Sequence, residues 1–366
     1  MNQGFSEFRV LQPVLHGSAT TAGGRLALAA TLNLEGATLE DGELAPGNWG
    51  EGFVDRRHPH TWVHELLAVA NLGDGLAPRP WAASLAAGKG FVPFGTDDPM
   101  DRPALRYPVN HHLAQILERA VLSAGGRYGP VALELSLFNG DEPERPGSWP
   151  NWERFGDSWA ARLTLSPGAG LELQGSFAEV ESPEHRGGAG PEQSKWSTSA
   201  RWTGAAWGGE GYALVEWART DEVEGIFTFE SLLAEAEWRR GALRPYLRVE
   251  RTERPEEERV DPPFRSARPH LDNSILGITR WTGVTWGIGV RAFRRGGLAV
   301  EPLVEGAWAA VASVGGGFFD PITWYGDDRL WSLTAAVVIR WDAPGPRHRM
   351  GRHGAVTTLD RHRSRP

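Results

Sequence analysis

The sequence predicts an all-β protein, an antiparallel transmembrane β-barrel of about 15–16 strands. Two observations predict this fold. Apolar and polar side chains alternate through segments of roughly ten residues from Arg25 to Trp341, and the connections between these segments are short and long in turn. Successive side chains of a strand point to opposite faces, so each segment has one apolar and one polar face. Continued without a helical stretch, this pattern is typical of a barrel whose apolar face meets lipid.

The expected strands differ in how clearly they alternate. The clear segments are 25–35, 131–139, 159–165, 171–177, 195–202, 243–250 and 331–341. In the last of these, Trp331, Leu333, Val337 and Trp341 share one face, and Arg340 lies on the other. Helical spacing explains none of them. Segments 61–72 and 112–123 are also expected to be strands, but their alternation is poor and does not assign their faces.

The connections sort into two classes. Short turns alternate with long loops at roughly 37–60, 91–110, 139–156, 181–194, 219–225, 253–273 and 313–327. Bacterial outer-membrane barrels show this asymmetry, with short turns on one side of the membrane and long loops on the other. The phase of alternation does not reset at Thr282-Gly283-Val284, so 274–294 is predicted to be one long strand.

The strand count raises a question about the N-terminus. Starting with a strand at 5–20, the pattern gives about fifteen strands, whereas bacterial single-chain barrels have an even number. The first residues also lack the basic and apolar regions of a signal peptide. One missing upstream strand, lost together with a signal peptide, would explain both observations. We therefore expect a natural protein of about sixteen strands.

Composition excludes several classes of protein. The absence of Cys excludes disulfides and thiol chemistry, and the formal net charge of -8 argues against nucleic acid as a partner. Seventeen Trp suit a membrane interface, although a soluble Trp-rich sandwich that binds sugars is the alternative. The barrel is expected to span residues 1–341. Residues 342–366 hold six Arg and three His and predict a basic, disordered C-terminal tail.

Four loop motifs resemble a known family. They are the runs 55–60 (DRRHPH), 95–100 (GTDDPM), 107–112 (YPVNHH) and 137–143 (LFNGDEP). In this order, they are similar to motifs of an uncharacterised family of porin-like outer-membrane proteins of environmental Gram-negative bacteria. The resemblance covers most of residues 20–341. It implies the barrel fold and an outer-membrane location, and it implies no substrate.

Histidines form the sharpest candidate site. His58, His60 and His64 precede or open one expected strand, and His111 and His112 open another, two strands away at the same long-loop end. Strands two apart are separated by about 10 Å, so these imidazoles could meet over the barrel mouth and bind Zn²⁺ or Cu²⁺. The alternative is that they anchor long loops to the barrel by hydrogen bonds.

Charged side chains on the polar faces form a second candidate site. They are Glu134, Arg162, Glu172, Lys195, Arg201, Arg244, Arg248, Glu250, Arg291, Glu301, Glu305 and Arg340. Opposed acidic and basic groups in a pore order water and filter polar solutes. The alternative is that they only solvate a wet interior or pair across neighbouring strands. Either way, so many charges favour a hydrophilic pore over a dry core.

The acidic, aromatic loop 139–157 permits two readings. With Asp141, Glu142, Trp149 and Trp152, it could fold inward as a constriction, or it could be an exposed loop stabilised by its prolines. No catalytic motif accompanies these sites. The pair His16 and Ser18 lacks a nucleophile elbow, so we expect no enzyme.

These observations leave three functional hypotheses. The first is an outer-membrane porin-like channel that passes small polar solutes or ions without a cofactor. The second is a non-conducting barrel that captures a transition metal at its His-rich mouth. The third is a soluble β-rich carbohydrate-binding protein. The expected partners are outer-membrane lipid, small solutes and, in a homo-oligomer, further copies of the chain.

Overall fold

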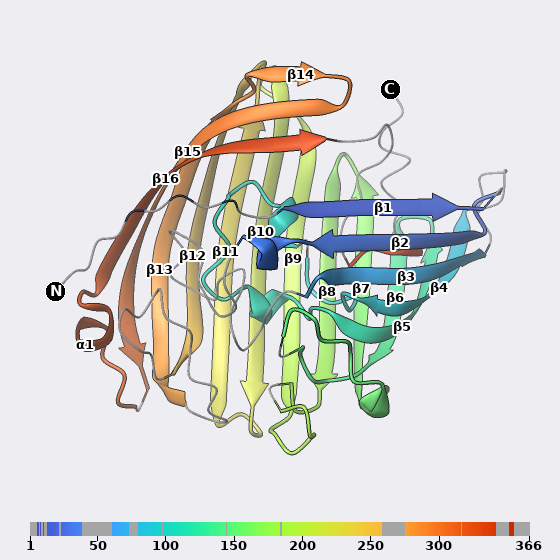
Figure 1. Ribbon diagram of the computed structural model, residues 1–366, viewed down its shortest axis with the longest axis horizontal. Helices are drawn as coiled ribbons and strands as arrows, with labels where there is room; N and C mark the ends of the chain where they lie inside the picture. Colours follow the sequence, from blue (N-terminus) through green and yellow to red (C-terminus); the bar gives the residue numbers. More distant parts are fainter. Residues whose placement is uncertain are drawn as a thin grey trace.

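The protein is a single curled antiparallel sheet. The computed structural model describes residues 6, 8, 10, 13–21, 23–38, 61–72, 80–96, 98–143, 145–183, 185–257, 275–315, 317–341 and 351–354. In this part of the chain, sixteen strands form one sheet that curves round an interior (Figure 1). The sandwich of two packed sheets, weighed as an alternative, is therefore wrong.

The strands follow one another in chain order. Their bounds are β1 (Val14–Thr20), β2 (Leu26–Asn33), β3 (Val63–Leu72), β4 (Trp81–Gly90), β5 (Arg119–Tyr128), β6 (Val131–Phe138), β7 (Ser158–Gly168), β8 (Leu171–Val180), β9 (Gln193–Ala206), β10 (Gly209–Glu222), β11 (Phe227–Arg239), β12 (Leu243–Glu257), β13 (Ile275–Val290), β14 (Phe293–Arg295), β15 (Leu298–Val314) and β16 (Arg329–Trp341). Helix is scarce. The described residues hold one α-helix, α1 (Pro321–Tyr325), and short 3-10 helices at Glu35–Ala37, Pro99–Asp101, His111–Ala114 and Trp152–Arg154. None of these helices is long and apolar enough to span a membrane.

The long strand expected at 274–294 is confirmed. β13 pairs with β12 and with β15 straight through Thr282-Gly283-Val284, without a turn. The three-residue strand β14 continues β13 along the same neighbour, β15. Because β14 extends β13, these two strands together make one pass along the barrel wall. The sixteen described strands therefore make fifteen passes.

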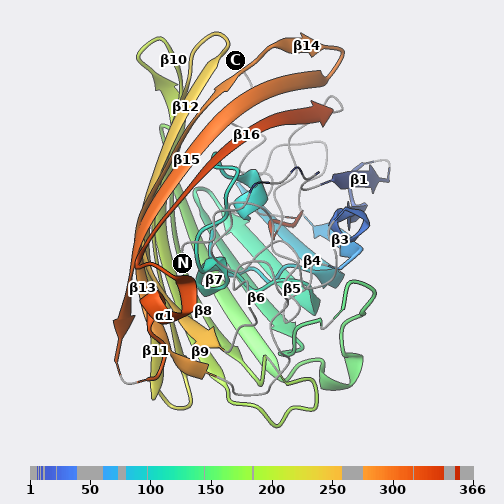
Figure 2. The same ribbon diagram turned by 60° about the vertical axis from the view of Figure 1, so that its left-hand side comes forward.

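The two edges of the sheet are β1 and β16. β1 pairs with β2, β16 pairs with β15, and no pairing within the described ranges joins β1 to β16. Figure 2 shows the sheet curving from one of these edges to the other. The additional first strand that we expected would precede Met1, so it lies outside the described residues.

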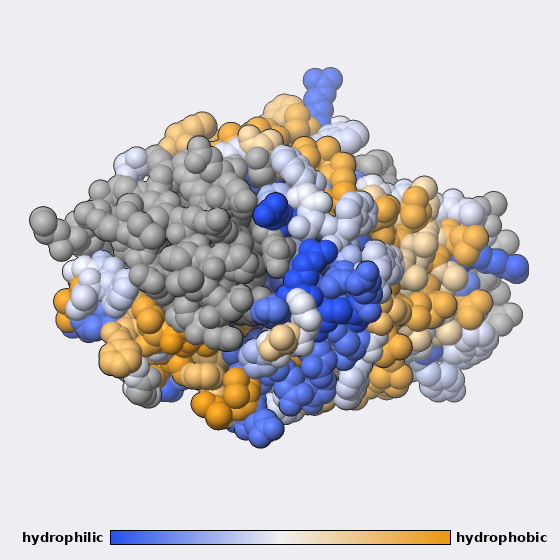
Figure 3. All heavy atoms as spheres, turned by 60° about the horizontal axis from the view of Figure 1, so that its bottom comes forward, coloured by the Kyte–Doolittle hydropathy of each residue, from blue (hydrophilic) through white to orange (hydrophobic). Residues whose placement is uncertain are grey.

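The apolar face of the sheet is its outer face. On β6, Leu133, Leu135 and Leu137 are exposed, whereas Glu134 between them is buried. The register places Leu137 beside Trp159 of β7 on the outside and Glu134 beside Arg162 on the inside. With the long-loop end turned forward, Figure 3 shows hydrophilic residues at this end and hydrophobic residues over the adjoining wall. The predicted alternation is therefore confirmed.

Two predicted boundaries are wrong. The loop expected at 219–225 is a short turn, because β10 runs to Glu222 and β11 begins at Phe227. Positive φ angles at Val223, Glu224 and Gly225 close this hairpin tightly. The strand expected at 112–123 begins at Arg119, and His111–Ala114 forms a 3-10 helix instead.

Poor alternation in β3 has a physical cause. Its inner face carries Leu67, which is fully buried, while Leu66 on the outer face is exposed. Leu67 packs inside the barrel with Val121 of β5 and Phe138 of β6. Both faces of β3 are therefore apolar at this point, and a two-residue period does not show in the sequence.

Candidate functional site

The inner wall of the sheet is lined with ion pairs. Arg162 Nε lies 2.6 Å from Glu134 Oε2, and Arg244 Nε lies 2.6 Å from Glu301 Oε1. Arg248 Nε lies 2.9 Å from Glu235 Oε2. Pairs of this kind are charge-assisted hydrogen bonds, which satisfy guanidinium and carboxylate groups away from bulk water. These parts of the inner wall are thus polar, and their charges pair with one another.

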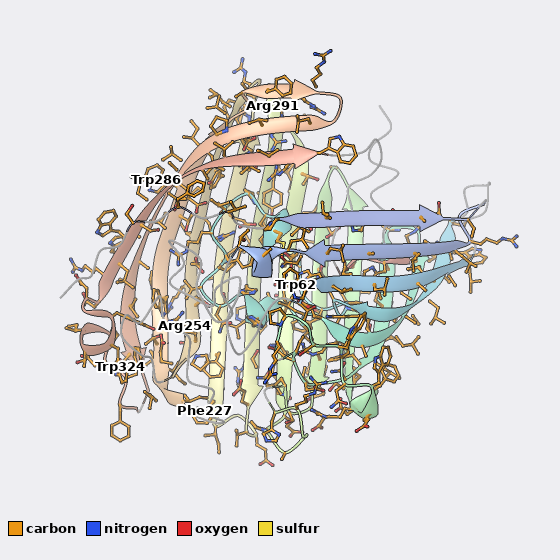
Figure 4. The ribbon with its side chains drawn as sticks, viewed as in Figure 1. Trp62, Phe227, Arg254, Trp286, Arg291 and Trp324 are labelled. Atoms are coloured by element: carbon orange, nitrogen blue, oxygen red, sulfur yellow. The ribbon has the colours of Figure 1, made fainter. Side chains whose placement is uncertain are left out.

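The predicted pore-lining residues mostly lie on this wall. The ones buried inside the sheet are Glu134, Arg162, Glu172, Lys195, Arg244, Arg248, Glu250, Glu301 and Glu305. Arg201, on the same face, lies 3.0 Å from Glu172. Arg291 and Arg340 are only partly buried, and Figure 4 shows Arg291 close to β14 at the short-turn end. The structure therefore brings most of the predicted pore-lining residues together on the inner wall. Arg291 and Arg340 lie at the edge of this group.

The connection between β4 and β5, residues 91–118, folds into the barrel. We call it the lumen loop; it is the cyan trace on the concave side of the sheet in Figure 1. Most of its described side chains are buried, including Phe94, Arg102, Tyr107 and Ile116. Loops normally run over a protein surface because their backbone groups need partners. The interior of this barrel must therefore supply those partners.

Wall carboxylates accept hydrogen bonds from the backbone of the lumen loop. Glu305 of β15 accepts from the N–H groups of Leu105 at 2.7 Å and Arg106 at 3.1 Å, and also from the Tyr246 hydroxyl at 2.8 Å. Glu250 of β12 accepts from the N–H of Val109 at 3.0 Å. These contacts hold the middle of the loop against β12 and β15.

Wall cations bind the carbonyls of the same loop. Arg244 donates to the Pro103 carbonyl at 3.0 Å, and Arg248 donates to the Arg106 carbonyl at 2.7 Å. Lys195 of β9 donates to the His112 carbonyl at 3.0 Å. Acidic wall residues therefore accept hydrogen bonds from the N–H groups of the loop, and basic wall residues donate to its carbonyls. The loop backbone thus uses both kinds of charge on the wall.

Two arginines of the lumen loop are themselves buried. Burial lowers the pKa of Arg106 to about 10, although Glu250 and Glu305 oppose this effect. Burial also disfavours the charge of Arg102, but Glu216, at 2.8 Å, and Glu235 outweigh it and raise the pKa of Arg102. Both guanidinium groups therefore carry their charge at neutral pH.

The two ends of the lumen loop pack in an apolar cluster. Val92, Phe94 and Ile116 of the loop are buried with wall residues of β3, β5, β6, β7 and β8. The wall members are Leu67, Val121, Phe138, Ala160, Ala178 and Val180. This side of the interior is a small hydrophobic core, in contrast to the charged side around β12 and β15.

A buried polar hub closes the loop where it rejoins the wall. Glu118, whose φ is +50°, accepts hydrogen bonds from the backbone N–H and the hydroxyl of Thr61. Its carboxylate also lies 2.7 Å from His64 Nδ1 and 3.2 Å from Lys89 Nζ. The positive φ is uncommon for a glutamate, and these contacts stabilise it.

A second loop covers the long-loop end of the charged side. Helix α1 places Tyr325 beside Trp281 of β13 and Val109 of the lumen loop. The Tyr325 hydroxyl lies 2.5 Å from both Glu256 and Arg254 of β12. Figure 4 shows Arg254 on the inner side of the sheet and Trp324 at α1. Asp320 caps α1, and hydrogen bonds from Thr323 hold the pKa of its carboxyl below the usual range.

Part of the C-terminal tail lies inside the barrel. Residues 351–354, which we call the C-terminal segment, include Arg352 and His353, and both are buried. Arg352 donates to Glu172 at 3.1 Å, Gln174 at 2.5 Å and Thr164 at 3.3 Å. The inner wall therefore supplies acceptors for a buried guanidinium, whereas the disorder expected of the tail stays a prediction. The other residues of 342–366 lie outside the described part of the chain.

The predicted histidine cluster is assembled only in part. His111 and His112 are neighbours with ring centroids 4.3 Å apart, and His112 Nδ1 lies 3.9 Å from Glu142. His64 is engaged by Glu118 instead. His58 and His60 lie outside the described residues. Among the residues that the structure describes, no group of three or more His, Cys, Asp or Glu is placed to hold a metal, so Zn²⁺ or Cu²⁺ binding stays a prediction.

Two aromatic side chains of loop 139–157 agree with the exposed reading of that loop, and the loop that folds inward is the lumen loop. In loop 139–157, Trp149 and Trp152 are about half exposed, and the Pro146 carbonyl accepts from the Trp62 N–H at the rim. The lumen loop carries the signal that was overlooked. Phe91, Phe94 and Ile116 are too apolar for a solvated connection of this length.

A small cavity remains between the lumen loop and the wall. Its volume is about 50 Å³, room for a few water molecules. Asn110 and Gln115 of the loop line it on one side, and Lys195 of β9 and Thr220 of β10 line it on the other. Two amides, a hydroxyl and the Lys195 ammonium thus line this space inside the barrel.

Known structures are similar to this chain at low identity and modest TM-scores. An anion-selective porin from Comamonas acidovorans has a TM-score of 0.47 at 10% identity, with 89% of this chain and 88% of that chain covered. OmpT, an outer-membrane protein of Vibrio cholerae, has a TM-score of 0.47 at 9% identity, covering 89% and 88%. OmpF of Salmonella typhi, in complex with daunomycin, has a TM-score of 0.46 at 10% identity, covering 92% and 93%.

No protein-family model matches the sequence, and no characterised protein sequence matches it either. Membership of the porin-like family that the loop motifs resemble therefore stays a prediction. At the identities and TM-scores of the structural matches, the functional argument rests on the geometry of this chain alone.

Proposed function

We propose that the chain is a porin-like channel of a Gram-negative outer membrane, through which small polar solutes or ions pass. One observation carries the proposal. A sheet with an apolar outer face encloses an interior of paired acidic and basic side chains, such as Arg162 with Glu134 and Arg244 with Glu301. This is the inverse of a soluble protein, whose apolar side chains face inward.

The outer face supports a lipid environment. Large apolar side chains remain exposed on strand after strand, including Leu135 on β6, Leu247 on β12, Trp286 on β13 and Ile339 on β16. Figure 4 places Trp286 on the outer side of the sheet. Exposed apolar area on this scale marks contact with a membrane or a partner. Exposed apolar side chains on strands from one edge of the sheet to the other favour lipid, because a barrel meets lipid all round.

The lumen loop supports selectivity by charge. It crosses the interior, where Arg102 pairs with Glu216 of the wall and the charge of Arg106 is opposed by those of Glu250 and Glu305. Fixed charges at a narrowed point order water and sort solutes by charge and size. The described residues contain nothing that favours metal capture over passage, so the channel is the function that the geometry supports best.

Planar bilayer recordings test the proposal. The full chain, folded in detergent, should give discrete conductance steps and should migrate differently on gels before and after heating. Heat-denatured protein in the same detergent is the control and should give no steps. A chain that stays monodisperse in buffer without detergent, or one that inserts without conducting, would contradict the proposal.

A further inference from the structure

The guanidinium of Arg352 occupies a site built from three wall residues. Its Nη2 donates to the Glu172 carboxylate at 3.1 Å and to the Gln174 side-chain carbonyl at 2.5 Å, and its Nη1 donates to the Thr164 hydroxyl at 3.3 Å. Thr164 lies on β7, and the other two residues lie on β8. Arg352 is 2% exposed, so water contributes little to this recognition.

The site is held in place by residues other than the C-terminal segment. Glu172 is also bound by Arg201 of β9 at 3.0 Å. The Gln174 amide donates to the Gly95 carbonyl of the lumen loop, which orients its own carbonyl oxygen toward Arg352. Since both acceptors are fixed by the barrel, the site is preorganised for a ligand.

The backbone of the C-terminal segment fits closely around this site. Arg162 donates to the Gly351 carbonyl at 2.6 Å and also to the Gly95 carbonyl at 3.5 Å. Gly354 packs on Ser84 of β4, where a Cβ atom would lie only 2.2 Å from the Ser84 hydroxyl oxygen. The four residues therefore extend from β7 and β8 to β4 and lie across part of the interior.

We infer that Thr164, Glu172 and Gln174 form a binding site for guanidinium groups, and that Arg352 is its tethered occupant. A small solute that carries a guanidinium, of which free arginine is the simplest, competes with Arg352 for the site. This inference rests on the proposed channel, because such a solute must enter the barrel. When Arg352 leaves, the C-terminal segment loses its anchor and the obstructed part of the interior opens.

The acceptor set favours guanidinium over other polar groups. A guanidinium offers five N–H donors in one plane, whereas an ammonium is a compact point charge. One carboxylate, one amide carbonyl and one hydroxyl spread over two strands match the planar group. A neutral urea group has fewer donors and no charge to pair with Glu172.

Calorimetric titration of the folded chain in detergent tests the site directly. L-arginine should bind at least tenfold more tightly to Arg352→Ala than to the unchanged chain, because the unchanged site is already filled. In the Arg352→Ala background, L-citrulline should bind at least tenfold more weakly than L-arginine, since hydrogen bonds to charged groups account for such a factor. Arg294→Ala, at an exposed arginine of β14, is the matched control and should bind like the unchanged chain.

Wall substitutions locate the site. In the Arg352→Ala background, Glu172→Gln should weaken L-arginine binding at least tenfold. Because Glu172 also binds Arg201, Thr164→Val serves as a second variant that keeps the wall packing, and it should weaken binding several-fold. Equal affinity for L-lysine and L-arginine, or equal L-arginine affinity of Arg352→Ala and the unchanged chain, would overturn the inference.

Bilayer conductance separates this inference from the proposed function. Arg352→Ala should conduct more than the unchanged chain, and millimolar L-arginine should reduce its current. Conductance in both proteins with no L-arginine binding would leave the channel standing and defeat the site. L-arginine binding with no conductance in either protein would leave the site standing and defeat the channel.

Discussion

The two sides of the barrel interior hold the lumen loop by different forces. On one side, Val92, Phe94 and Ile116 pack with Leu67 and Phe138 in an apolar cluster. On the other side, Glu305, Glu250 and Arg248 bind the loop backbone. The apolar side contributes through area removed from water, which does not depend on direction. The charged side satisfies peptide groups that have no strand or helix partner, and it depends strongly on direction.

This difference explains why both kinds of contact are present. Packing alone would leave buried N–H and carbonyl groups of the loop unsatisfied, at a cost of about 1–3 kcal/mol each. Charges alone would have to be desolvated without the gain from apolar burial. Together, apolar packing and charged contacts keep the lumen loop inside the barrel. Substitutions that act on one side at a time can measure how much each side contributes to holding the lumen loop in place.

The largest expected effect comes from Glu305→Ala on the charged side. It removes three hydrogen bonds to a carboxylate, each worth about 1.5–3 kcal/mol, and leaves the Leu105 and Arg106 N–H groups without this acceptor. The loop should detach from the wall. Trypsin, which cannot reach buried Arg106 in the unchanged protein, should then cut after it, and conductance should rise.

A carboxylate on the outer side is the control for this change. The Glu253 side chain of β12 pairs with the partly exposed Arg280, and Glu253 contacts the loop only through its backbone carbonyl, which accepts from Asn110 and is kept in the variant. Glu253→Ala should leave trypsin resistance at Arg106 intact. If Glu305→Ala resisted trypsin as well as Glu253→Ala does, packing would hold the loop by itself.

Leu67→Ala acts on the apolar side and should come second. Truncating a fully buried leucine costs about 2–5 kcal/mol, so unfolding in micelles should begin at a lower denaturant concentration. The loss should be the same in 0.1 M and 1 M salt, because no charge is involved. Leu85→Ala, at a half-exposed leucine of the outer face, should change the unfolding midpoint far less. A strong salt dependence of the destabilisation by Leu67→Ala would contradict the conclusion that apolar packing alone holds this side of the loop.

A smaller effect is expected from Gly287→Ala. A Cβ at Gly287 would lie 2.2 Å from the Tyr246 hydroxyl oxygen, so this side chain must move and its bond to Glu305 must weaken. Overpacking of this kind costs about 1–3 kcal/mol. Gly126→Ala is the matched control, since nothing lies within 4 Å of the added Cβ. Trypsin cleavage at Arg106 should rise modestly in the first variant and stay unchanged in the second.

The smallest effect concerns Asp320 and pH. Hydrogen bonds from Thr323 lower the pKa of this carboxyl, so the ionised form stabilises the start of α1. This contribution is present above the ordinary aspartate pKa and is lost as pH falls through the lowered value. The ¹⁹F signal of 5-fluorotryptophan at Trp324, assigned with Trp324→Phe, should shift with a midpoint below pH 3.8. In Asp320→Ala the low-pH signal should already be seen at pH 7.

The periodic parts of the molecule could be predicted because their signal is local. The parity of Leu133, Glu134 and Leu135 assigned inner and outer faces on β6, and the unbroken phase through Thr282 established β13 as one strand. The same reasoning failed at 219–225, where positive φ at Val223 and Glu224 allowed a tight turn without an obvious turn sequence. It failed again on β3, where the inner face is apolar.

The candidate site was harder to predict because it joins distant residues. Many charges of the inner wall were identified one by one, but Glu216, Glu235 and Arg254 were missed, and no partners were assigned. Glu305 contacts Arg106 across 199 positions, and Arg352 contacts Glu172 across 180. No periodicity links such positions. The apolar composition of 91–118 was the available signal that this loop is not solvated.

What the sequence determined by itself is the sheet: its strands, the apolar outer face and the polar inner face. These follow from a two-residue period that most strands, though not β3, carry independently. Only the tertiary structure decided what fills the interior. The lumen loop and Arg352 lie there because the curled wall offers apolar contacts on one side and charged acceptors and donors on the other. That combination exists only once the strands have curled round the interior.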